Sequence, residues 1–379
     1  MLPNSLPRNY PGIDLLRALA AMLVLVYHVI VFGNWSSLPD TGFFYLLRHG
    51  WAGVNLFFTI SGFVIALSAL DGVQQQGRSF RRPFAIRRLA RIVPLYLLTC
   101  LVFLFLVQPA VLLAPLWKLA THVSTHLLFV HNLHPSTHGS INGPSWSVAL
   151  EMQFYLAMML AAPWLARTSA LRVLLYAIVI AAAWRYATLL VLVPGGASTE
   201  VQFVYLSELP GVIDEFALGI ALAMVVRSNT GPISAWLAVG WTHFLGWLAL
   251  ALALLTAAAR LEQTFGYWGN TAMTVGWHLV LSAGFAALLG AGVTFPWAGK
   301  RLLAPVRYLG DISYGIYLWH MLVLVAMTTA MPLLTGRKLL VFVVGSTVAL
   351  ASLSWHLLEK PNLQKYKGPH SNAPRESLP

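Results

Sequence analysis

An arginine and a histidine interrupt an otherwise apolar segment near the start of the chain. Arg17 and His28 are eleven residues apart, so on a helix they point the same way at a separation of roughly 16 Å. Asp14 lies one turn before Arg17 and can pair with it. Imidazole is the usual general base near neutral pH. The pattern indicates either a catalytic base with a cation on the same helix face, or a histidine that bonds a neighbouring carbonyl and serves packing.

Six arginines gather between residues 78 and 91, which is more than the orientation of a helix requires: Arg78, Arg81, Arg82, Arg87, Arg88 and Arg91. The last three directly precede an apolar run. Guanidinium groups bind phosphate through paired hydrogen bonds, so we expect Arg87, Arg88 and Arg91 to hold a phosphorylated donor such as coenzyme A. The alternative is a basic cluster that fixes topology and contacts anionic lipid.

A carboxylate lies about two turns inside the apolar segment that follows Asn142-Gly143-Pro144. This residue is Glu151, with Tyr155 one turn further on; Ser145 is the predicted N-cap, and Trp146 and Ser147 come directly after it. A carboxylate at that depth needs a cation, an imidazole or a water-filled cavity. We therefore expect Glu151 to orient His28 if their helices meet. A hydrogen bond from a Ser or Tyr is the alternative.

Weaker signals come from polar residues in other apolar segments. Ser61, with Asn55 and Gly62, lies in an aromatic-rich run, where small polar residues usually serve helix packing. Tyr317 and His320 end the stretch GDISYGIYLWH. The adjacent acids Asp214 and Glu215 require a cavity or a basic partner.

The loop histidines do not predict a metal site. They are His122, His126, His131, His134 and His138. Their spacing includes an i, i+4 pair, but there is no HExxH and no nearby thiolate or ligating carboxylate. We interpret them as interfacial residues.

The elements that position these side chains must be membrane helices. Of the 379 residues 58% are apolar and 9% charged, whereas soluble domains carry about 25% charged residues. This predicts an all-α, polytopic transmembrane helical bundle of about ten helices. The expected spans are 14–33, 51–70, 92–110, 145–165, 172–193, 209–226, 233–256, 273–295, 309–330 and 339–358. Residues 111–144, 194–208 and 257–272 would face outside.

The distribution of basic residues favours one orientation. With the N-terminus inside and residues 118–133 not spanning, the inside loops hold about 18 of the 24 Lys and Arg residues. The segment 118–133 could span, re-enter or lie at the surface, but a span would remove this asymmetry. We therefore expect ten spans and both termini in the cytoplasm, although Arg337 and Lys338 fall on the wrong side. The net charge of +12 thus reflects topology and predicts no nucleic-acid partner.

In this order, the motifs resemble those of acyltransferase family 3. They are Arg17-x10-His28, GVNLFFTISGF, RRLARIVPLYLL, SWSVALEMQFY, DISYGIYLWH and Glu359-Lys360-Pro361. The resemblance covers about residues 10 to 361, which we take as one transmembrane acyltransferase domain. Residues 362–379 are expected to be a disordered cytoplasmic tail. Some members of the family carry a fused extracytoplasmic domain, and this chain looks like the stand-alone form.

The resemblance implies a membrane-bound enzyme of the bacterial inner membrane that moves an acyl group, usually acetyl from acetyl-CoA, to a hydroxyl of a surface or periplasmic carbohydrate or its lipid-linked precursor. The family's essential residues match Arg17 and His28, and its further motifs match the three arginines and Ser145, Trp146, Ser147 and Glu151. Our hypothesis makes His28, Glu151 and Arg17 catalytic. Substrate binding would be supported by Ser61, the Ser-Trp-Ser motif, Tyr155, Tyr317 and His320. The expected co-substrate is acyl-CoA, and no metal is expected. The alternative is a transporter or flippase for an anionic glycolipid.

Overall fold

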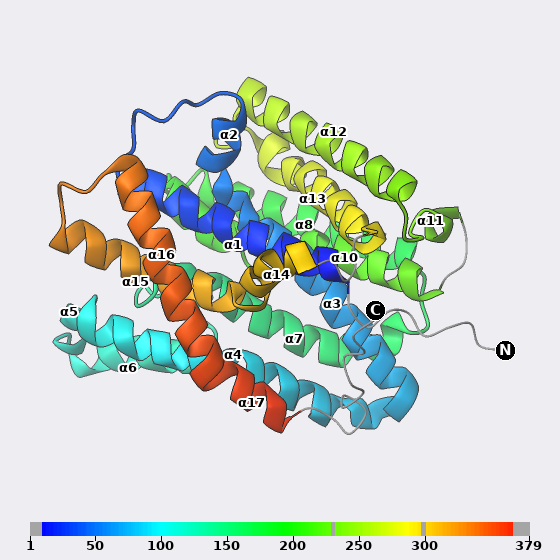
Figure 1. Ribbon diagram of the computed structural model, residues 1–379, viewed down its shortest axis with the longest axis horizontal. Coiled ribbons are helices and arrows are strands. Elements are labelled where there is room, and N and C mark those ends of the chain that lie inside the picture. Colours follow the sequence, from blue (N-terminus) through cyan, green and yellow to red (C-terminus); the bar gives the residue numbers. More distant parts are fainter. Residues whose placement is uncertain (1–9, 229–231, 297–300, 367–379) are drawn as a thin grey trace.

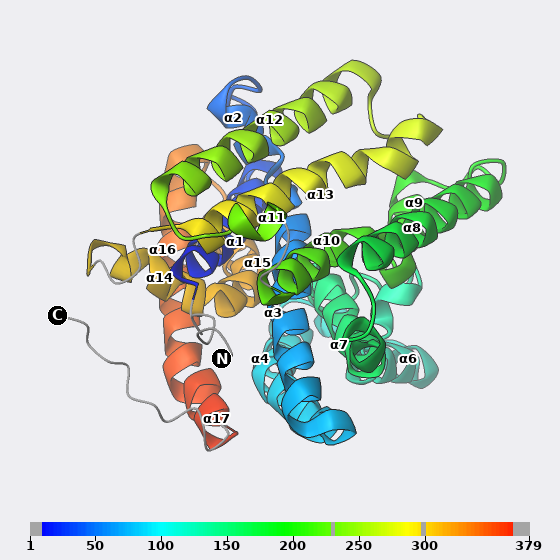
Figure 2. The ribbon, with the colours of Figure 1, turned by 90° about the vertical axis from the view of Figure 1, so that its right-hand side faces the viewer.

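A computed structural model describes residues 10–228, 232–296 and 301–366, and every regular element in these ranges is helical. The long helices lie side by side, with α1 (Pro11–Phe32) running through the middle of the bundle (Figure 1). Figure 2 shows the same arrangement from a second direction, with α3, α14 and α15 beside α1. The predicted all-α helical bundle is confirmed.

Ten helices of the described residues are at least 18 residues long, in agreement with the predicted number. They form nine candidate membrane spans, because Gly50–Leu106 is one continuous segment. That segment contains two helices, which reverse direction at Gly77, whose positive φ of 56° suits glycine. Besides α1, the long helices are α3 (Gly53–Gln76), α4 (Arg81–Leu106), α7 (Trp146–Leu165), α8 (Ala170–Leu192), α10 (Leu209–Ser228), α12 (Trp241–Phe265), α13 (Thr271–Thr294), α15 (Ser313–Ala330) and α16 (Gly336–Ser354).

Shorter elements connect the long helices. The undecided segment 118–133 begins inside α6 (Leu116–Leu127). The 12 residues of this helix extend about 18 Å, which is too short for a hydrocarbon layer of about 30 Å. The even number of long helices therefore leaves residues 10 and 366 at the same end of the bundle. The other short α-helices are α2 (Phe43–Arg48), α5 (Pro109–Leu112), α9 (Thr199–Leu206), α11 (Pro232–Ala235), α14 (Ala304–Asp311) and α17 (Lys360–Lys365). Turns of 3-10 helix lie at Gly50–Ala52, Gly77–Phe80, His131–Leu133, Gly143–Ser145 and Arg301–Leu303. A turn of π-helix lies at Trp355–Glu359.

Some predicted boundaries were wrong. The span expected at 233–256 is α12, which begins at Trp241 after an extended Gly240 and runs to Phe265. Glu262, expected in an outer loop, is therefore helical and accepts a hydrogen bond from Tyr45 at 2.8 Å. The tail expected from residue 362 starts within α17. Residues 367–379 lie outside the described part of the chain.

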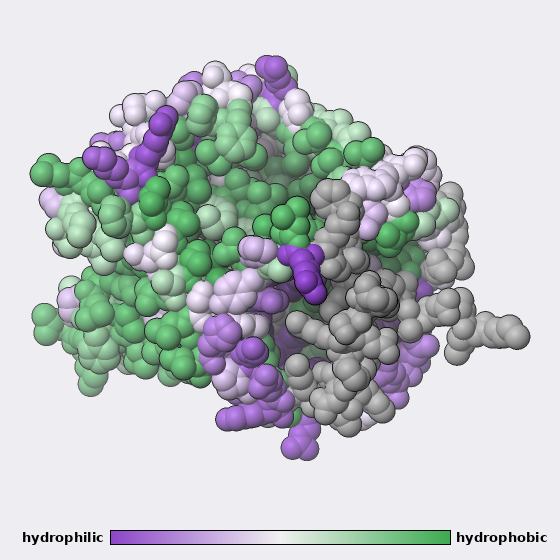
Figure 3. Space-filling model, in the orientation of Figure 1, coloured by the Kyte–Doolittle hydropathy of each residue, from purple (hydrophilic) through white to green (hydrophobic). Residues whose placement is uncertain are grey.

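Close helix contacts rest on glycines, as expected for Gly62. A Cβ on Gly219 of α10 would lie 2.0 Å from the carbonyl oxygen of Thr59 on α3, and one on Gly62 would lie 2.1 Å from that of Phe216. Only a residue without a side chain permits this approach. On the outside, Leu101, Phe105 and other large apolar side chains of the long helices are exposed. Figure 3 shows a broad hydrophobic surface with hydrophilic residues gathered towards the upper left and the lower edge. This surface suits lipid.

We name the two ends of the bundle the proximal end and the distal end, and define each by the connections that it holds. The proximal end holds residues 10 and 366 and the α3–α4 turn. The distal end holds the connections at 33–49, 107–142, 193–208, 266–270 and 331–335, because successive long helices alternate in direction.

Candidate active site

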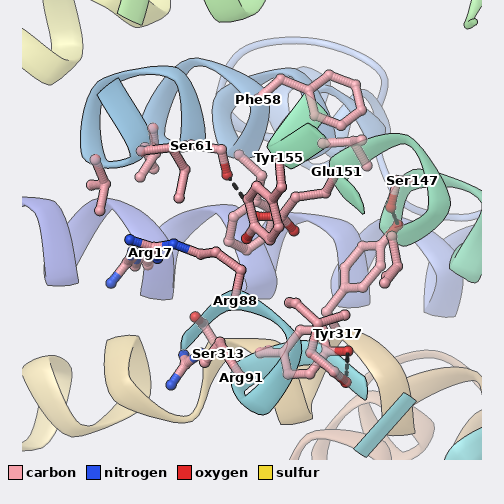
Figure 4. Close-up of a pocket in the computed structure, with 18 residues that line it drawn as sticks. Arg17, Phe58, Ser61, Arg88, Arg91, Ser147, Glu151, Tyr155, Ser313 and Tyr317 are labelled. Atoms are coloured by element: carbon pink, nitrogen blue, oxygen red, sulfur yellow. Dashed lines mark hydrogen bonds between the residues drawn. The ribbon is translucent and has the colours of Figure 1, made fainter. Parts of the chain in front are cut away.

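A pocket of about 100 Å³ lies where α1, α3, α4, α7 and α15 meet. Figure 4 shows its labelled side chains, which come from all five helices and point towards one another. The polar lining residues are Arg17, Ser61, Arg88, Arg91, Ser147, Glu151, Tyr155, Ser313, Tyr314 and Tyr317, and the rest are apolar. The structure thus brings most of the predicted site residues together from segments up to 300 residues apart.

Three guanidinium groups give the pocket a positive character. Arg17 comes from α1, whereas Arg88 and Arg91 come from the first turns of α4. The Nε of Arg88 is buried and has no hydrogen-bond partner among the described residues. Arg91 donates to the backbone oxygen of Asp311 at 3.5 Å. Glu151 is the only acid that lines the pocket, so the described lining carries an excess of positive charge that suits an anionic ligand.

Arg87 was expected to act with Arg88 and Arg91, but it is not among the residues that line the pocket. The helical spacing allowed either Arg87 or Arg88 to share a face with Arg91, because positions i+3 and i+4 are both neighbours on a helix. Packing decides between them: the guanidinium of Arg88 lies 5.4 Å from the ring centre of Phe84 and 5.8 Å from that of Tyr155. The structure also adds Arg17 to the group.

Glu151 is held by two hydroxyl groups. Its Oε1 accepts hydrogen bonds from Ser61 at 3.0 Å and from Tyr155 at 2.5 Å. This is the alternative that the sequence left open, a carboxylate bonded to Ser and Tyr. Because both hydroxyls bond the same oxygen, the carboxylate is fixed beside Arg17 and Arg88 in the pocket wall (Figure 4).

His28 pairs with another histidine. Its Nδ1 lies 2.8 Å from the backbone oxygen of Val24 and 3.3 Å from the Nε2 of His320. The carbonyl can only accept, so Nδ1 of His28 carries a proton and Nε2 carries the lone pair. His320 likewise donates from Nδ1 to the oxygen of Tyr317 at 2.7 Å. His320, not Glu151, is therefore the side chain that orients His28 in this structure.

The Ser-Trp-Ser motif links the pocket to the distal end. Ser147 lies 2.7 Å from the hydroxyl of Tyr317, which in turn donates to the oxygen of Pro144 at 2.8 Å. Ser145 stands at the N-cap of α7 as predicted but makes no side-chain cap bond. Its φ of −68° and ψ of −12° are helical, whereas a capping side chain needs an extended backbone. Its hydroxyl instead lies 3.3 Å from Nε2 of His131.

The loop histidines pack against aromatic and histidine rings. The rings of His126 and His131 stack at 3.9 Å with an interplanar angle of 8°, and that of His138 stacks on Trp146 at 5.3 Å. Burial lowers the pKa of His126 to about 4 and that of His131 to about 3. Both rings are therefore neutral at physiological pH.

A second buried polar cluster lies outside the pocket, and its basic members were missed in the sequence. Arg185 of α8 forms a bidentate pair with Asp214 at 2.8 and 3.0 Å. Glu215 accepts a hydrogen bond from Asn55 at 2.8 Å and lies 3.1 Å from Nδ1 of His278. The sequence could have predicted a role for Arg185, because an arginine in the middle of an apolar segment needs a partner. The cluster provides the basic partner that the acidic pair required.

Comparisons with known proteins agree on one family. The family model of the acyltransferase domain matches residues 10–356. The putative peptidoglycan O-acetyltransferase YrhL of Bacillus subtilis is 28% identical over 93% of this chain and 55% of its own length. The peptidoglycan O-acetyltransferase OatA of Listeria monocytogenes is 27% identical over 93% of this chain and 56% of its own length. Nodulation protein 10 of Rhizobium leguminosarum is 27% identical over 93% of this chain and 92% of its own. The chain thus spans about half the length of the first two relatives, and no solved structure matches it.

Proposed function

This chain belongs to the acyltransferase domain family, and on that premise we propose that it is a membrane-bound O-acyltransferase. It moves an acyl group, in the first instance acetyl, from acyl-CoA on the cytoplasmic side to a hydroxyl of a cell-surface or periplasmic carbohydrate or of its lipid-linked precursor. The observation that carries the proposal is the arginine-lined pocket inside the bundle, whose lining residue Tyr317 bonds His320, the ring partner of His28. His28 itself does not line this pocket. Relatives named as peptidoglycan O-acetyltransferases support the carbohydrate acceptor.

The pocket suits the reacting end of a charged donor. A cavity of about 100 Å³ is smaller than the roughly 300–1,000 Å³ that encloses a drug-sized ligand. It has room for a thioester arm, while the phosphates remain nearer the proximal end, where α4 begins with basic residues. The unpartnered Nε of Arg88 supports this fit, because a buried donor without a partner is costly. Arg91 and Arg17 add to the positive wall.

His28 then acts as the general base. Its Nε2 removes the proton of the acceptor hydroxyl, and the resulting oxygen attacks the thioester carbonyl. The carbon–sulfur bond breaks, and the proton taken by His28 passes to the departing thiolate, so the products are an ester and free coenzyme A. The backbone oxygen of Val24 holds the imidazole in the required tautomer, and His320 contacts the same ring nitrogen. Glu151 balances the charge of Arg17 and Arg88 in the pocket wall. Holding donor and acceptor together contributes about 7–11 kcal/mol to such reactions.

Charge assigns the two ends of the bundle to the two sides of the membrane. We place the protein in a bacterial inner membrane with both termini in the cytoplasm, because basic residues gather in the proximal connections. The proximal end is then the donor side, and the distal end is the acceptor side.

Label transfer from radiolabelled acetyl-CoA tests the proposal. Inverted membrane vesicles carrying wild type, His28→Ala or His243→Ala at matched expression are incubated with the donor, and label in glycan and lipid fractions is counted. His243 of α12 is the control, because it bonds the backbone oxygen of Ala238 and does not line the pocket. We expect wild type and the control to transfer label and His28→Ala to lose at least about 100-fold, the contribution typical of a general base.

Two results would contradict the proposal. Equal transfer by all three proteins would make His28 structural and remove the mechanism. Absence of transfer by wild type, together with protein-dependent movement of a glycolipid across the membrane, would establish the transporter instead.

A further inference from the structure

A second pocket, at the distal end, is not used by the reaction described above. It has a volume of about 600 Å³ and is bounded by the connection around residues 135–139, by α9 and by the α12–α13 connection. In Figure 2, α9 and the α12–α13 connection both lie towards the upper right. Its size falls within the roughly 300–1,000 Å³ typical of ligand sites. We call it the distal pocket.

The lining of the distal pocket combines aromatic faces with a few polar groups. Trp268 and Phe203 are 42% and 38% exposed, so both rings present free surface at this site. Glu200 is an exposed carboxylate in the first turn of α9, and a hydrogen bond from Ser198 lowers its pKa. The carboxylate is therefore ionised and can only accept. Aromatic faces that cover the apolar C–H face of a sugar ring, with planar polar groups that bond its hydroxyls, are what a carbohydrate requires.

A buried, unpartnered nitrogen marks the same pocket as a ligand site. His138 is 9% exposed and lines the distal pocket. Its Nε2 has no hydrogen-bond partner within the described part of the chain. Most buried polar atoms are paired, and one that is not calls for a ligand or a water. A hydroxyl group in the distal pocket would supply the missing partner.

One tryptophan connects the distal pocket to the arginine-lined pocket. Trp146 of the Ser-Trp-Ser motif stacks on His138 at 5.3 Å and meets Phe203 edge-on at the same distance. On its other side it meets Phe58 at 6.2 Å, and Phe58 lines the arginine-lined pocket. Two residues of the distal wall and one of the inner wall therefore contact the same ring.

We propose that the distal pocket binds the carbohydrate acceptor, with a sugar ring stacked on Trp268 and its hydroxyls bonded to Glu200 and to Nε2 of His138. Trp146 lies between this sugar and the arginine-lined pocket, so the sugar bound here is a part of the acceptor other than the ring that reacts. The proposal rests on the proposed function for its choice of acceptor, and it adds a binding site on the side opposite the donor arginines.

Photolabelling of the purified full-length protein in nanodiscs tests the site independently of catalysis. The probes are diazirine-bearing tetrasaccharides of glucose and of N-acetylglucosamine, and the labelled residues are mapped by mass spectrometry. We expect label from at least one probe in residues 135–139, 199–204 or 268. Trp268→Ala should raise the half-saturating probe concentration at least about tenfold, equivalent to about 1.4 kcal/mol. Glu200→Gln should raise it by a smaller factor.

Trp117→Ala is the matched control, because Trp117 is an exposed tryptophan at the same end that does not line the pocket. It should leave labelling unchanged. Label confined to other segments, no saturable label from either probe, or equal effects of Trp268→Ala and Trp117→Ala would each overturn the site. Acetyl transfer by wild type with label elsewhere would refute the distal pocket alone. Label in the distal pocket without acetyl transfer would uphold the site and refute the acyltransferase.

Discussion

Replacement of Arg88 by methionine should weaken donor binding much more than the same replacement at Arg87. The two residues are adjacent on α4, but only Arg88 lines the pocket, and its Nε is buried without a partner. Methionine keeps an apolar stem against Phe84 and Tyr155 and removes only the charged group. The comparison therefore isolates the guanidinium.

The magnitude follows from the contacts that are lost. A hydrogen bond to a charged group contributes about 1.5–3 kcal/mol, and each 1.4 kcal/mol corresponds to about tenfold in affinity. Arg88→Met should raise the KM for acetyl-CoA by about 10- to 150-fold. Arg87→Met removes a cation that lies outside the pocket, and at physiological salt such a charge is screened over about 8 Å. Its effect should stay within about threefold.

The assay is acetyl transfer by protein in nanodiscs, with acetyl-CoA varied at a fixed, saturating acceptor concentration. Direct binding of radiolabelled acetyl-CoA to the same samples separates affinity from turnover, because KM equals the dissociation constant only when chemistry is slow. Equal increases for the two variants would show that the arginines act as a diffuse basic surface. An unchanged KM for Arg88→Met would refute the assignment of the donor to this pocket.

Three further predictions concern stability. Arg185→Met leaves Asp214 and Glu215 buried without their cation and should destabilise the protein by about 3–5 kcal/mol. The measurement is Tm, which should fall in this variant and be partly restored when Arg185 and Asp214 are replaced together. An unchanged Tm would contradict this prediction. Gly219→Ala places a Cβ 2.0 Å from the oxygen of Thr59 and should reduce Tm and folded yield. Gly276→Ala is the control, because its Cβ meets nothing within 4 Å, and it should leave both unchanged. Similar losses in the two variants would contradict the packing argument. Burial lowers the pKa of His126 from 6.5 to about 4 and that of His131 from 6.5 to about 3. The unfolded state therefore binds more protons below pH 6.5, and the free energy of unfolding should fall as the pH drops from about 6.5 towards these values. The loss is at most about 1.4 kcal/mol for each histidine and each pH unit. His131→Gln should flatten the curve of Tm against pH, whereas His134→Gln, at an exposed site, should leave it unchanged; equal slopes in all three proteins would refute the effect.

The distal pocket would have been hard to find in the sequence. Trp268, Phe203 and His138 come from three connections separated by more than 60 residues at each step, and none of them forms a pattern with the others. Connections carry no regular periodicity, so their relative positions depend on how the long helices pack. The same reason explains why His278 was missed, since one histidine in an apolar segment gains a meaning only beside Glu215.

The sequence by itself determined the class of fold, the number of long helices and most of the polar residues in the pocket. Apolar segments of about 20 residues must be helical in lipid, because every backbone polar group needs a partner there. Arg17, Glu151 and the arginines of α4 were conspicuous for the same reason, as charges in an environment that penalises them. Tertiary structure alone decided the partners: Glu151 bonds Ser61 and Tyr155, and His28 pairs with His320. Helical periodicity fixes which side chains share a face, but the rotation and crossing of each helix, set by contacts such as Gly62 against Phe216, decide which faces meet.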